Sequence, residues 1–229
     1  MKVSICLIVI GLLAVFPVFA QVSPDAPVRL NEQRKYQTSA AAWKLYDKGR
    51  IEAARGNRSQ ALKYFREAIT RDPELAAAYN DLGAIYLAQG ELSQAVELFR
   101  QALALAPNHR LALANLSMAL MRMNRYREAG EAARRGLDVD PGHAGLQLIL
   151  AASLMAQPGK TGEALEHLER ASAQIPRAHL LAADVLVNAA RREEAMQHLE
   201  EYLRVAAPRD AGRAGTEARL AQLRREQPR

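Results

Sequence analysis

The feature that most limits how this chain can fold is a repeat of 34 residues. Three sets of residues keep this spacing: Pro73, Pro107 and Pro141; Ala61, Ala95 and Ala129; and the turn residues Gly56, Gly90 and Asn124. Glycine and asparagine tolerate the left-handed backbone that ends many helices. Because a single helical hairpin cannot bury its own apolar face, a repeat of this length predicts short helices stacked in sequence.

Composition favours helices over strands. Alanine, leucine, arginine and glutamate dominate the chain, and aromatic residues make up only 5% of it. Runs of β-branched residues are nearly absent after the first twenty residues. Each repeated proline ends a helix, because it lacks the backbone donor that the next turn would need. The sequence therefore predicts an all-α fold.

The repeats share a pattern of small, aromatic and turn residues. Residues 76–109 carry the fullest copy, at Tyr79, Leu82, Gly83, Tyr86, Ala95, Phe99, Ala102 and Pro107. The other copies keep Gly49, Ala61, Phe65, Pro73, Leu116, Ala129, Pro141, Ala164 and Pro176. This pattern resembles the tetratricopeptide repeat family, with its W-x2-L-G-x2-Y, A-x3-F and P signature. The first repeat departs from the family at Lys48 and Glu52, where leucine and tyrosine are expected.

The resemblance implies a right-handed superhelical solenoid of about five helix-turn-helix repeats. We expect the array to cover residues 42–209, with repeats at 42–75, 76–109, 110–143, 144–175 and 176–209. The fifth repeat has an uncertain register, because its first helix must begin almost at Pro176. Residues 210–229 are expected to form a C-terminal capping helix and tail, with Ala218, Leu220 and Leu223 on a mostly charged helix.

The first twenty residues have the pattern of a secretory signal. Lys2 precedes an apolar run at 3–16, and a Val-Phe-Ala triplet at 18–20 offers a cleavage site after Ala20. We therefore expect a signal peptide at 1–20 and an exported protein, periplasmic or secreted. The apolar run is shorter than the roughly 20 residues of a membrane-spanning helix, and an uncleaved anchor is the alternative. Residues 21–41 read as a flexible tether or as plain N-terminal disorder.

The residues needed for common catalytic chemistry are sparse. Cys6, the single cysteine, would leave with the signal, so disulfides and thiolate chemistry are not expected. The five histidines form no i, i+4 ligand pair, and no glycine-rich phosphate loop occurs. We expect no enzyme activity, no cofactor and no metal site.

The resemblance also implies a concave groove lined by the first helix of each repeat. The side chains expected to face it are Trp43, Tyr46, Arg50, Asn80, Asp81, Ala84, Asn115, Met118, Met121, Arg122, Leu148, Ala152 and Met155. Asparagine side chains can pair with a peptide backbone, and tryptophan, tyrosine and methionine offer apolar contacts. Arginines can pair with carboxylates of a ligand. The expected partner is therefore a protein or peptide.

One groove pattern of the family, a lysine and asparagine clamp for a C-terminal carboxylate, is not matched. The corresponding residues here are Tyr46, Arg50, Asp81, Leu111 and Asn115, of which only Asn115 fits. Because the carboxylate of Asp81 would repel another carboxylate, we do not expect a receptor for chaperone tails.

Charge argues against nucleic acid as the partner. The formal net charge of +6 becomes +5 when Lys2 leaves with the signal, but the bases are unevenly spread. Residues 42–75 carry 8 bases against 5 acids, whereas residues 76–109 carry Arg100 alone against three acids. A continuous basic stripe is missing, so no nucleic acid is expected. An anionic membrane surface stays an alternative for the tail arginines, Arg219, Arg224, Arg225 and Arg229.

These features favour a non-catalytic scaffold or adaptor of the cell envelope that binds a protein or peptide in its groove. Two alternatives stay open. One is a substrate-recruiting or assembly module for an envelope enzyme or an appendage machine. The other is a membrane-anchored repeat protein that keeps its signal segment.

Overall fold

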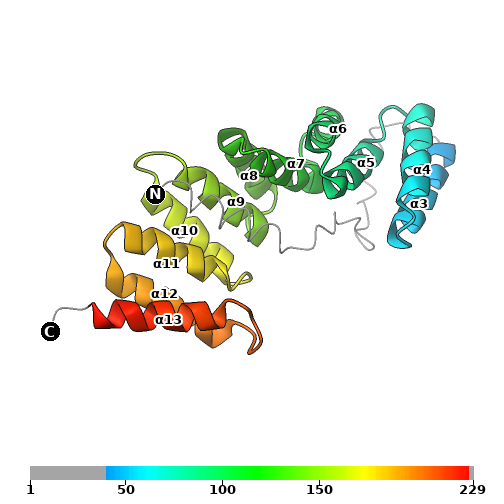
Figure 1. Ribbon diagram of the computed structural model, residues 1–229. Coiled ribbons are helices and arrows are strands. Elements are labelled where there is room, and N and C mark those ends of the chain that lie inside the picture. Colours follow the sequence, from blue (N-terminus) through cyan, green and yellow to red (C-terminus); the bar gives the residue numbers. More distant parts are fainter. Residues whose placement is uncertain (1–39, 227–229) are drawn as a thin grey trace. The chain divides into compact units, whose positions relative to one another are not determined.

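The computed structural model describes residues 40–226 of the chain, and these form eleven helices and no strand (Figure 1). The expected signal peptide at 1–20 and nearly all of the tether at 21–41 lie outside the described residues. Helix α3 begins at Ala40, so it includes two alanines that the sequence assigns to the tether, in keeping with the high helix propensity of alanine. Within residues 40–226, no helix is both long and apolar enough to cross a bilayer.

The described residues belong to two compact units, an N-terminal unit of residues 40–139 and a C-terminal unit of residues 140–226. The helices of the N-terminal unit are α3 (Ala40–Ala54), α4 (Arg58–Arg71), α5 (Ala76–Gln89), α6 (Leu92–Leu105), α7 (Arg110–Arg122) and α8 (Tyr126–Val139). Those of the C-terminal unit are α9 (Ala144–Met155), α10 (Thr161–Ser172), α11 (Ala178–Asn188), α12 (Arg192–Val205) and α13 (Arg213–Arg225).

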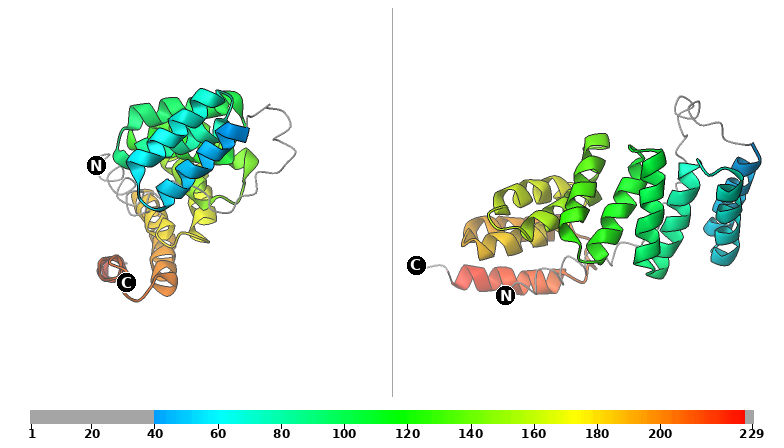
Figure 2. Two further views of the ribbon diagram at one scale, coloured as in Figure 1. Left: turned by 90° about the vertical axis from the view of Figure 1, so that its right-hand side faces the viewer. Right: turned by 90° about the horizontal axis from the view of Figure 1, so that it is seen from above.

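Within each unit, consecutive helices pair as hairpins and each hairpin packs on the next. In the N-terminal unit, α3 pairs with α4, α5 with α6 and α7 with α8, and these hairpins follow one another side by side (Figure 2). In the C-terminal unit, α9 pairs with α10, α11 pairs with α12, and α13 packs on α12. The predicted all-α helical repeat fold is confirmed.

Close contact inside the first two hairpins depends on glycine. A β-carbon added to Gly83 would lie 2.8 Å from the ring of Phe99, and one added to Gly49 would lie 2.6 Å from the ring of Phe65. Both rings are completely buried. The absence of a side chain at the two glycines therefore makes room for the aromatic rings of α4 and α6.

The turns inside the hairpins have the left-handed backbone that the sequence predicts. The φ angle is +82° at Gly56, +84° at Gly90 and +59° at Asn124. In the fifth repeat the same turn position holds Ala190, with φ +58°. Since a β-carbon disfavours this conformation, Ala190 is strained where a glycine would not be.

Helix α13 packs on α12 at the C-terminal end of the described residues. Helix α11 begins at Ala178, close behind Pro176, which resolves the register of the fifth repeat. On α13, Leu220 and Leu223 are buried, whereas Ala218 is exposed. The loop before α13 is held by the carboxylate of Asp210. This carboxylate accepts hydrogen bonds from the hydroxyl of Tyr202, the backbone amide of Gly212 and the guanidinium group of Arg177.

Candidate functional site

A ladder of polar side chains links the first helices of the three repeats in the N-terminal unit. The hydroxyl of Tyr46 on α3 donates to Oδ2 of Asp81 on α5, at 2.9 Å. The amide of Asn80 donates to Oδ1 of the same carboxylate, at 2.9 Å. The amide of Asn115 on α7 then donates to Oδ1 of Asn80, at 3.1 Å. One chain of hydrogen bonds therefore runs across α3, α5 and α7.

Asp81 lies at the centre of this ladder and is only 4% exposed. Burial raises the pKa of its carboxyl group to about 6, against the opposing effects of the two hydrogen bonds and of the positive charge of Arg50. Burial, together with the negative charge of Asp81, also raises the pKa of Tyr46. The ladder therefore contains an acid that titrates near neutral pH and a phenol that stays protonated there.

Aromatic and arginine side chains flank the ladder. The ring of Trp43 packs edge-on against the ring of Tyr46, with centroids 5.4 Å apart. The guanidinium carbon of Arg50 lies 5.8 Å from the centroid of the Tyr46 ring. On α7, Nη1 of Arg122 donates to the carbonyl oxygen of Leu87, at 2.8 Å. Arg122 thus fixes α7 to α5 just beyond the ladder.

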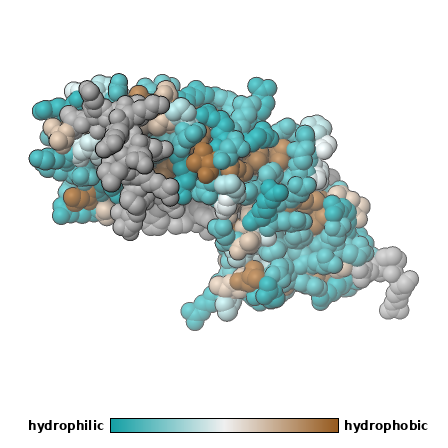
Figure 3. All heavy atoms as spheres, turned by 180° about the vertical axis from the view of Figure 1, so that it is seen from behind, coloured by the Kyte–Doolittle hydropathy of each residue, from teal (hydrophilic) through white to brown (hydrophobic). Residues whose placement is uncertain are grey.

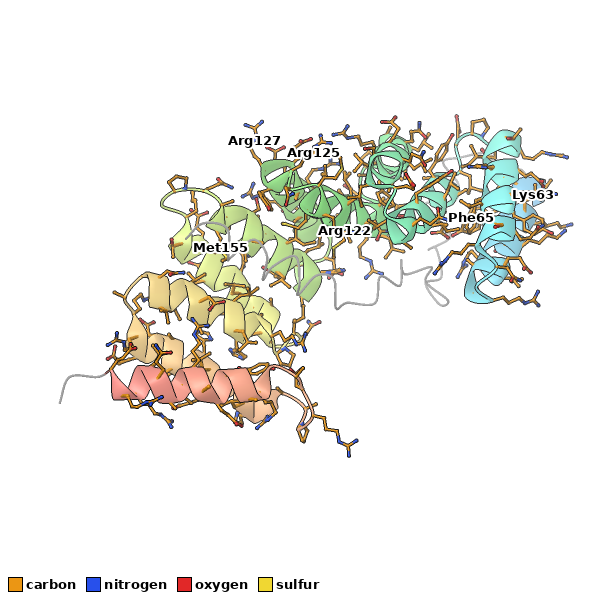
Figure 4. All side chains as sticks on the ribbon, in the orientation of Figure 1. Lys63, Phe65, Arg122, Arg125, Arg127 and Met155 are labelled. Carbon is orange, nitrogen blue, oxygen red and sulfur yellow. The ribbon has the colours of Figure 1, made fainter. Side chains whose placement is uncertain are left out.

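The thirteen residues expected to line the groove divide into two groups. Six are half-buried and keep exposed surface: Trp43, Arg50, Asn115, Met118, Arg122 and Met155. Seven are buried: Tyr46, Asn80, Asp81, Ala84, Met121, Leu148 and Ala152. Figure 4 labels Arg122 and Met155 from the first group, and also Lys63 and Phe65, which are exposed and buried respectively on α4.

The structure corrects the groove prediction for four of the buried residues. Met121 and Leu148 are 0% exposed and Ala84 is 1% exposed, so these side chains pack in the interior instead of lining the groove. Asn80, which we expected to pair with a peptide backbone, is 1% exposed and uses its amide within the ladder. Its role in this structure is to support Asp81 and Asn115.

In the C-terminal unit, two polar contacts that involve histidine lie inside hairpins. Nδ1 of His179 on α11 lies 2.9 Å from Nδ1 of His198 on α12. Nδ1 of His167 on α10 lies 2.5 Å from Oε1 of Gln147 on α9. Sequence reasoning missed both pairs, because it considered histidine partners within one helix. Their signal is positional, since His167 and His198 lie at corresponding places in the second helices of successive repeats.

Burial lowers the pKa values of both members of the histidine pair. For His179, the neighbouring His198 lowers the pKa further, Glu201 raises it and Arg204 lowers it. For His198, Glu169, Glu194 and Glu201 raise the pKa against the effect of burial. A hydrogen bond between the two rings needs at least one neutral ring. The bond therefore forms at neutral pH, and acid breaks it by protonating both rings.

A hollow lined by residues of α10, α11 and α12 includes His198 of the histidine pair. Its floor is apolar, from Leu165 and Leu186, and its rim is formed by Gly162, Glu166, Glu169, Arg191, Glu194 and His198. Arg191 and Glu194 pair with each other through two hydrogen bonds of 2.7 and 2.6 Å. Among residues 40–226, no three histidine, cysteine or acidic side chains are placed to hold a metal ion.

The arginines near the C-terminus are largely engaged within the chain. Arg219 pairs with Asp184 of α11, and Nη2 of Arg224 donates to Glu200 of α12 at 2.7 Å. The side chain of Arg225 donates to the backbone oxygen of Ala221. The contacts of Arg219 and Arg224 join α13 to α11 and α12, whereas the contact of Arg225 lies within α13. The molecular face drawn in Figure 3 is mostly hydrophilic, with small, separate hydrophobic patches.

Comparisons with known proteins agree with this architecture. Two family models, both described as tetratricopeptide repeat, match residues 46–110 and 86–154. No curated protein matches the sequence significantly.

Several solved structures share the fold. A fragment of MamA from Desulfovibrio magneticus RS-1 is 18% identical, with 76% of this chain and 99% of the fragment covered and a TM-score of 0.67. YrrB, described as a TPR protein with an unusual peptide-binding site, is 16% identical, with coverage of 82% and 97% and a TM-score of 0.68. PilF of Pseudomonas aeruginosa is 24% identical, with coverage of 81% and 85% and a TM-score of 0.68. At these identities the likeness shows the fold alone.

Proposed function

Because this chain belongs to the tetratricopeptide repeat family, we propose that it is a non-catalytic scaffold that holds a protein or peptide on the first-helix face of its N-terminal unit. We call this surface the binding face and define it by the half-buried residues Trp43, Asn115, Met118 and Arg122. YrrB, which has the same fold, is described as having a peptide-binding site, and this supports the proposal.

The observation that carries the proposal is that hydrogen bonds fix the side chains of Asn115 and Arg122 on the binding face. Asn115 has one amide hydrogen bond fixed by Asn80, which orients its side chain. Arg122 is oriented in the same way by the carbonyl oxygen of Leu87. Side chains whose rotamers are already fixed lose less entropy when they bind a ligand. Trp43 on α3 and Met118 on α7 supply apolar surface.

Site-specific photo-crosslinking tests the binding face. A photoreactive residue in place of Met118 should capture a partner in cells. The same residue in place of Arg134, an exposed side chain on α8, is the matched control and should capture it far less. Equal capture from both positions would show that the first-helix face is the wrong surface. We avoid replacing Asn80 in this test, because its buried amide supports the ladder.

A second arm of the test measures affinity for the captured partner. Replacing Trp43 or Met118 by alanine should weaken binding. At the minority of interface positions that carry most of the binding energy, which are enriched in tryptophan, truncation to alanine costs more than about 1 kcal/mol. Helical circular dichroism should stay unchanged for both variants. Unchanged affinity in both variants would contradict the proposal.

We further propose that the scaffold acts in the cell envelope after export. The support is the signal-like pattern of residues 1–20, namely Lys2, the apolar run and the small residues before position 21. Mass spectrometry of the protein from cells tests this: a mature N-terminus at Gln21 is expected. A retained Met1 would contradict cleavage and favour the anchored alternative.

A further inference from the structure

The surroundings of Asp81 disfavour the negative charge of its carboxylate. The two groups that donate to its carboxylate, the hydroxyl of Tyr46 and the amide of Asn80, are both neutral. Asp81 is only 4% exposed. A buried carboxylate held by neutral donors is costly, and such a group takes up a proton more readily than an exposed one.

The groups around Asp81 come from three helices. From α3, Tyr46 donates to it and Arg50 acts on it through its positive charge, while the exposed Asp47 acts on Tyr46. From α5, Asn80 donates to it, and from α7, Asn115 holds Asn80. Arg50 favours the charged form, but burial outweighs this effect. The net balance favours protonation in the mildly acidic range.

We propose that Asp81 is a proton-operated latch between the first two repeats, and that its protonation changes both the docking of α3 on α5 and the charge beneath the binding face. The second part rests on the proposed function, because it concerns the surface that would hold the partner. With Asp81 charged, its carboxylate offsets part of the positive potential of Arg50. With Asp81 protonated, this offset is lost, and the face favours a partner that carries carboxylates.

The direction of the effect on stability follows from linkage. The pKa of Asp81 is raised from 3.8 to about 6 in the folded protein, so the folded state binds the proton more tightly than the unfolded state. The stabilisation of the folded state by protonation of Asp81 is complete below about pH 4 and is lost as the pH rises through about 6. Acid therefore strengthens the docking of the first hairpin. A shift of about two pKa units corresponds to about a hundredfold change in the equilibrium between the folded state, which buries Asp81, and the unfolded state.

Trp43 provides a local reporter of the latch. It is the only tryptophan of the chain, and its ring packs against Tyr46, the phenol that donates to Asp81. Tryptophan fluorescence therefore reports on the first hairpin alone. The single tryptophan of the chain lies on α3, so the tryptophan signal comes from the N-terminal unit.

The experiment follows Trp43 fluorescence of the purified protein from about pH 8 to about pH 5. The wild type should show one transition with a midpoint of about 6. The Asp81→Asn variant, which keeps the size of the side chain, should lack it, and the control Asp47→Asn should retain it, because Asp47 is exposed on α3. Absence of the transition in the wild type, or its persistence in Asp81→Asn, would overturn the latch.

A measurement on the wild type alone guards against misfolding of the variant. The side-chain carboxyl carbon of Asp81, followed by NMR, should titrate near the same midpoint of about 6. Titration at the ordinary aspartate value of about 4 would overturn the proposal. Neither measurement uses a partner, so failure of the latch leaves the proposed function standing. Failure of the crosslinking test removes only the part of the latch proposal that concerns the binding face.

Discussion

In the N-terminal unit, the helices of the second hairpin meet where Gly83 faces the buried ring of Phe99. In the C-terminal unit, the corresponding positions of the fifth repeat hold Ala183 and Leu199, which are both 0% exposed. The second hairpin places nearly all the bulk at this contact on its second helix, and the hairpin of the fifth repeat shares it between both helices. The comparison shows that two hairpins of one chain can divide the volume at this contact differently between their helices.

The Tyr46–Asp81 and His179–His198 pairs also differ in which helices they join. In the N-terminal unit, Tyr46 reaches Asp81, 35 residues along the chain, and thus connects neighbouring repeats. In the C-terminal unit, His179 reaches His198, 19 residues along, and thus closes a single hairpin. Polar contacts between repeats couple the unfolding of neighbours, whereas contacts within a hairpin stabilise that hairpin alone.

The largest expected effect comes from adding a large side chain at Gly83, next to the ring of Phe99. Gly83→Leu should destabilise the N-terminal unit by about 3 kcal/mol, at the upper end of the usual cost of overpacking, because even a β-carbon would meet Phe99. Chemical denaturation followed by circular dichroism measures this. The control Ala183→Gly should cost only about 1 kcal/mol, from helix propensity. Equal costs for the two variants would contradict the difference in packing.

A second variant breaks the contact between repeats. Tyr46→Phe removes the hydroxyl that donates to the carboxylate of Asp81 and should cost about 1–3 kcal/mol, the usual penalty for a buried acceptor left without its donor. Denaturation near neutral pH should show the loss, and the loss should shrink in the Asp81→Asn background. Additive effects of the two substitutions would mean that Tyr46 and Asp81 are not coupled.

The turn of the fifth repeat offers a gain in stability. Ala190→Gly should stabilise the C-terminal unit by about 1 kcal/mol, because alanine has φ +58° there and pays a penalty that glycine does not. Thermal denaturation measures the gain. The reverse change at the matching turn, Gly90→Ala, with φ +84°, should lower stability by a similar amount. A destabilised Ala190→Gly protein would count against the left-handed turn.

The smallest expected effect separates the two units by their response to acid. Burial lowers the pKa values of His179 and His198, so the folded state binds protons less tightly than the unfolded state. The stability from this pair is present above pH 6.5 and is lost as the pH falls through the lowered values, the opposite sign to Asp81. His198→Leu, which introduces the residue that the second repeat has at Leu98, should reduce the acid-induced loss of Tm by a few degrees. Trp43 fluorescence should titrate as before, and a changed midpoint would show that the units are coupled.

Much of the fold could be predicted from the spacing of small residues and prolines. The ends of α5 and α6 fall inside the predicted repeat at 76–109, and the left-handed turns lie at the predicted Gly56, Gly90 and Asn124. The strained turn at Ala190 was not predicted, because alanine carries no turn signal of its own.

The candidate site was less predictable, because periodicity gives the direction of a side chain but not the depth at which its neighbours cover it. Met118 and Met121 lie on the same helix, yet the first keeps exposed surface and the second has none. The pairing of Tyr46 with Asp81 depends on how two repeats are rotated against each other. The spacing of residue types along the chain does not determine that rotation.

The contact between Gly83 and Phe99 also restricts how sequences of this kind can change. Enlarging the glycine alone creates a steric clash, and shrinking the phenylalanine alone leaves a cavity, so each single step lowers stability. The arrangement of the fifth repeat, Ala183 with Leu199, is therefore reached from that of the second most easily by two substitutions made together. In an alignment of related chains, these two columns should covary within each repeat, and this would be visible without any knowledge of the partner.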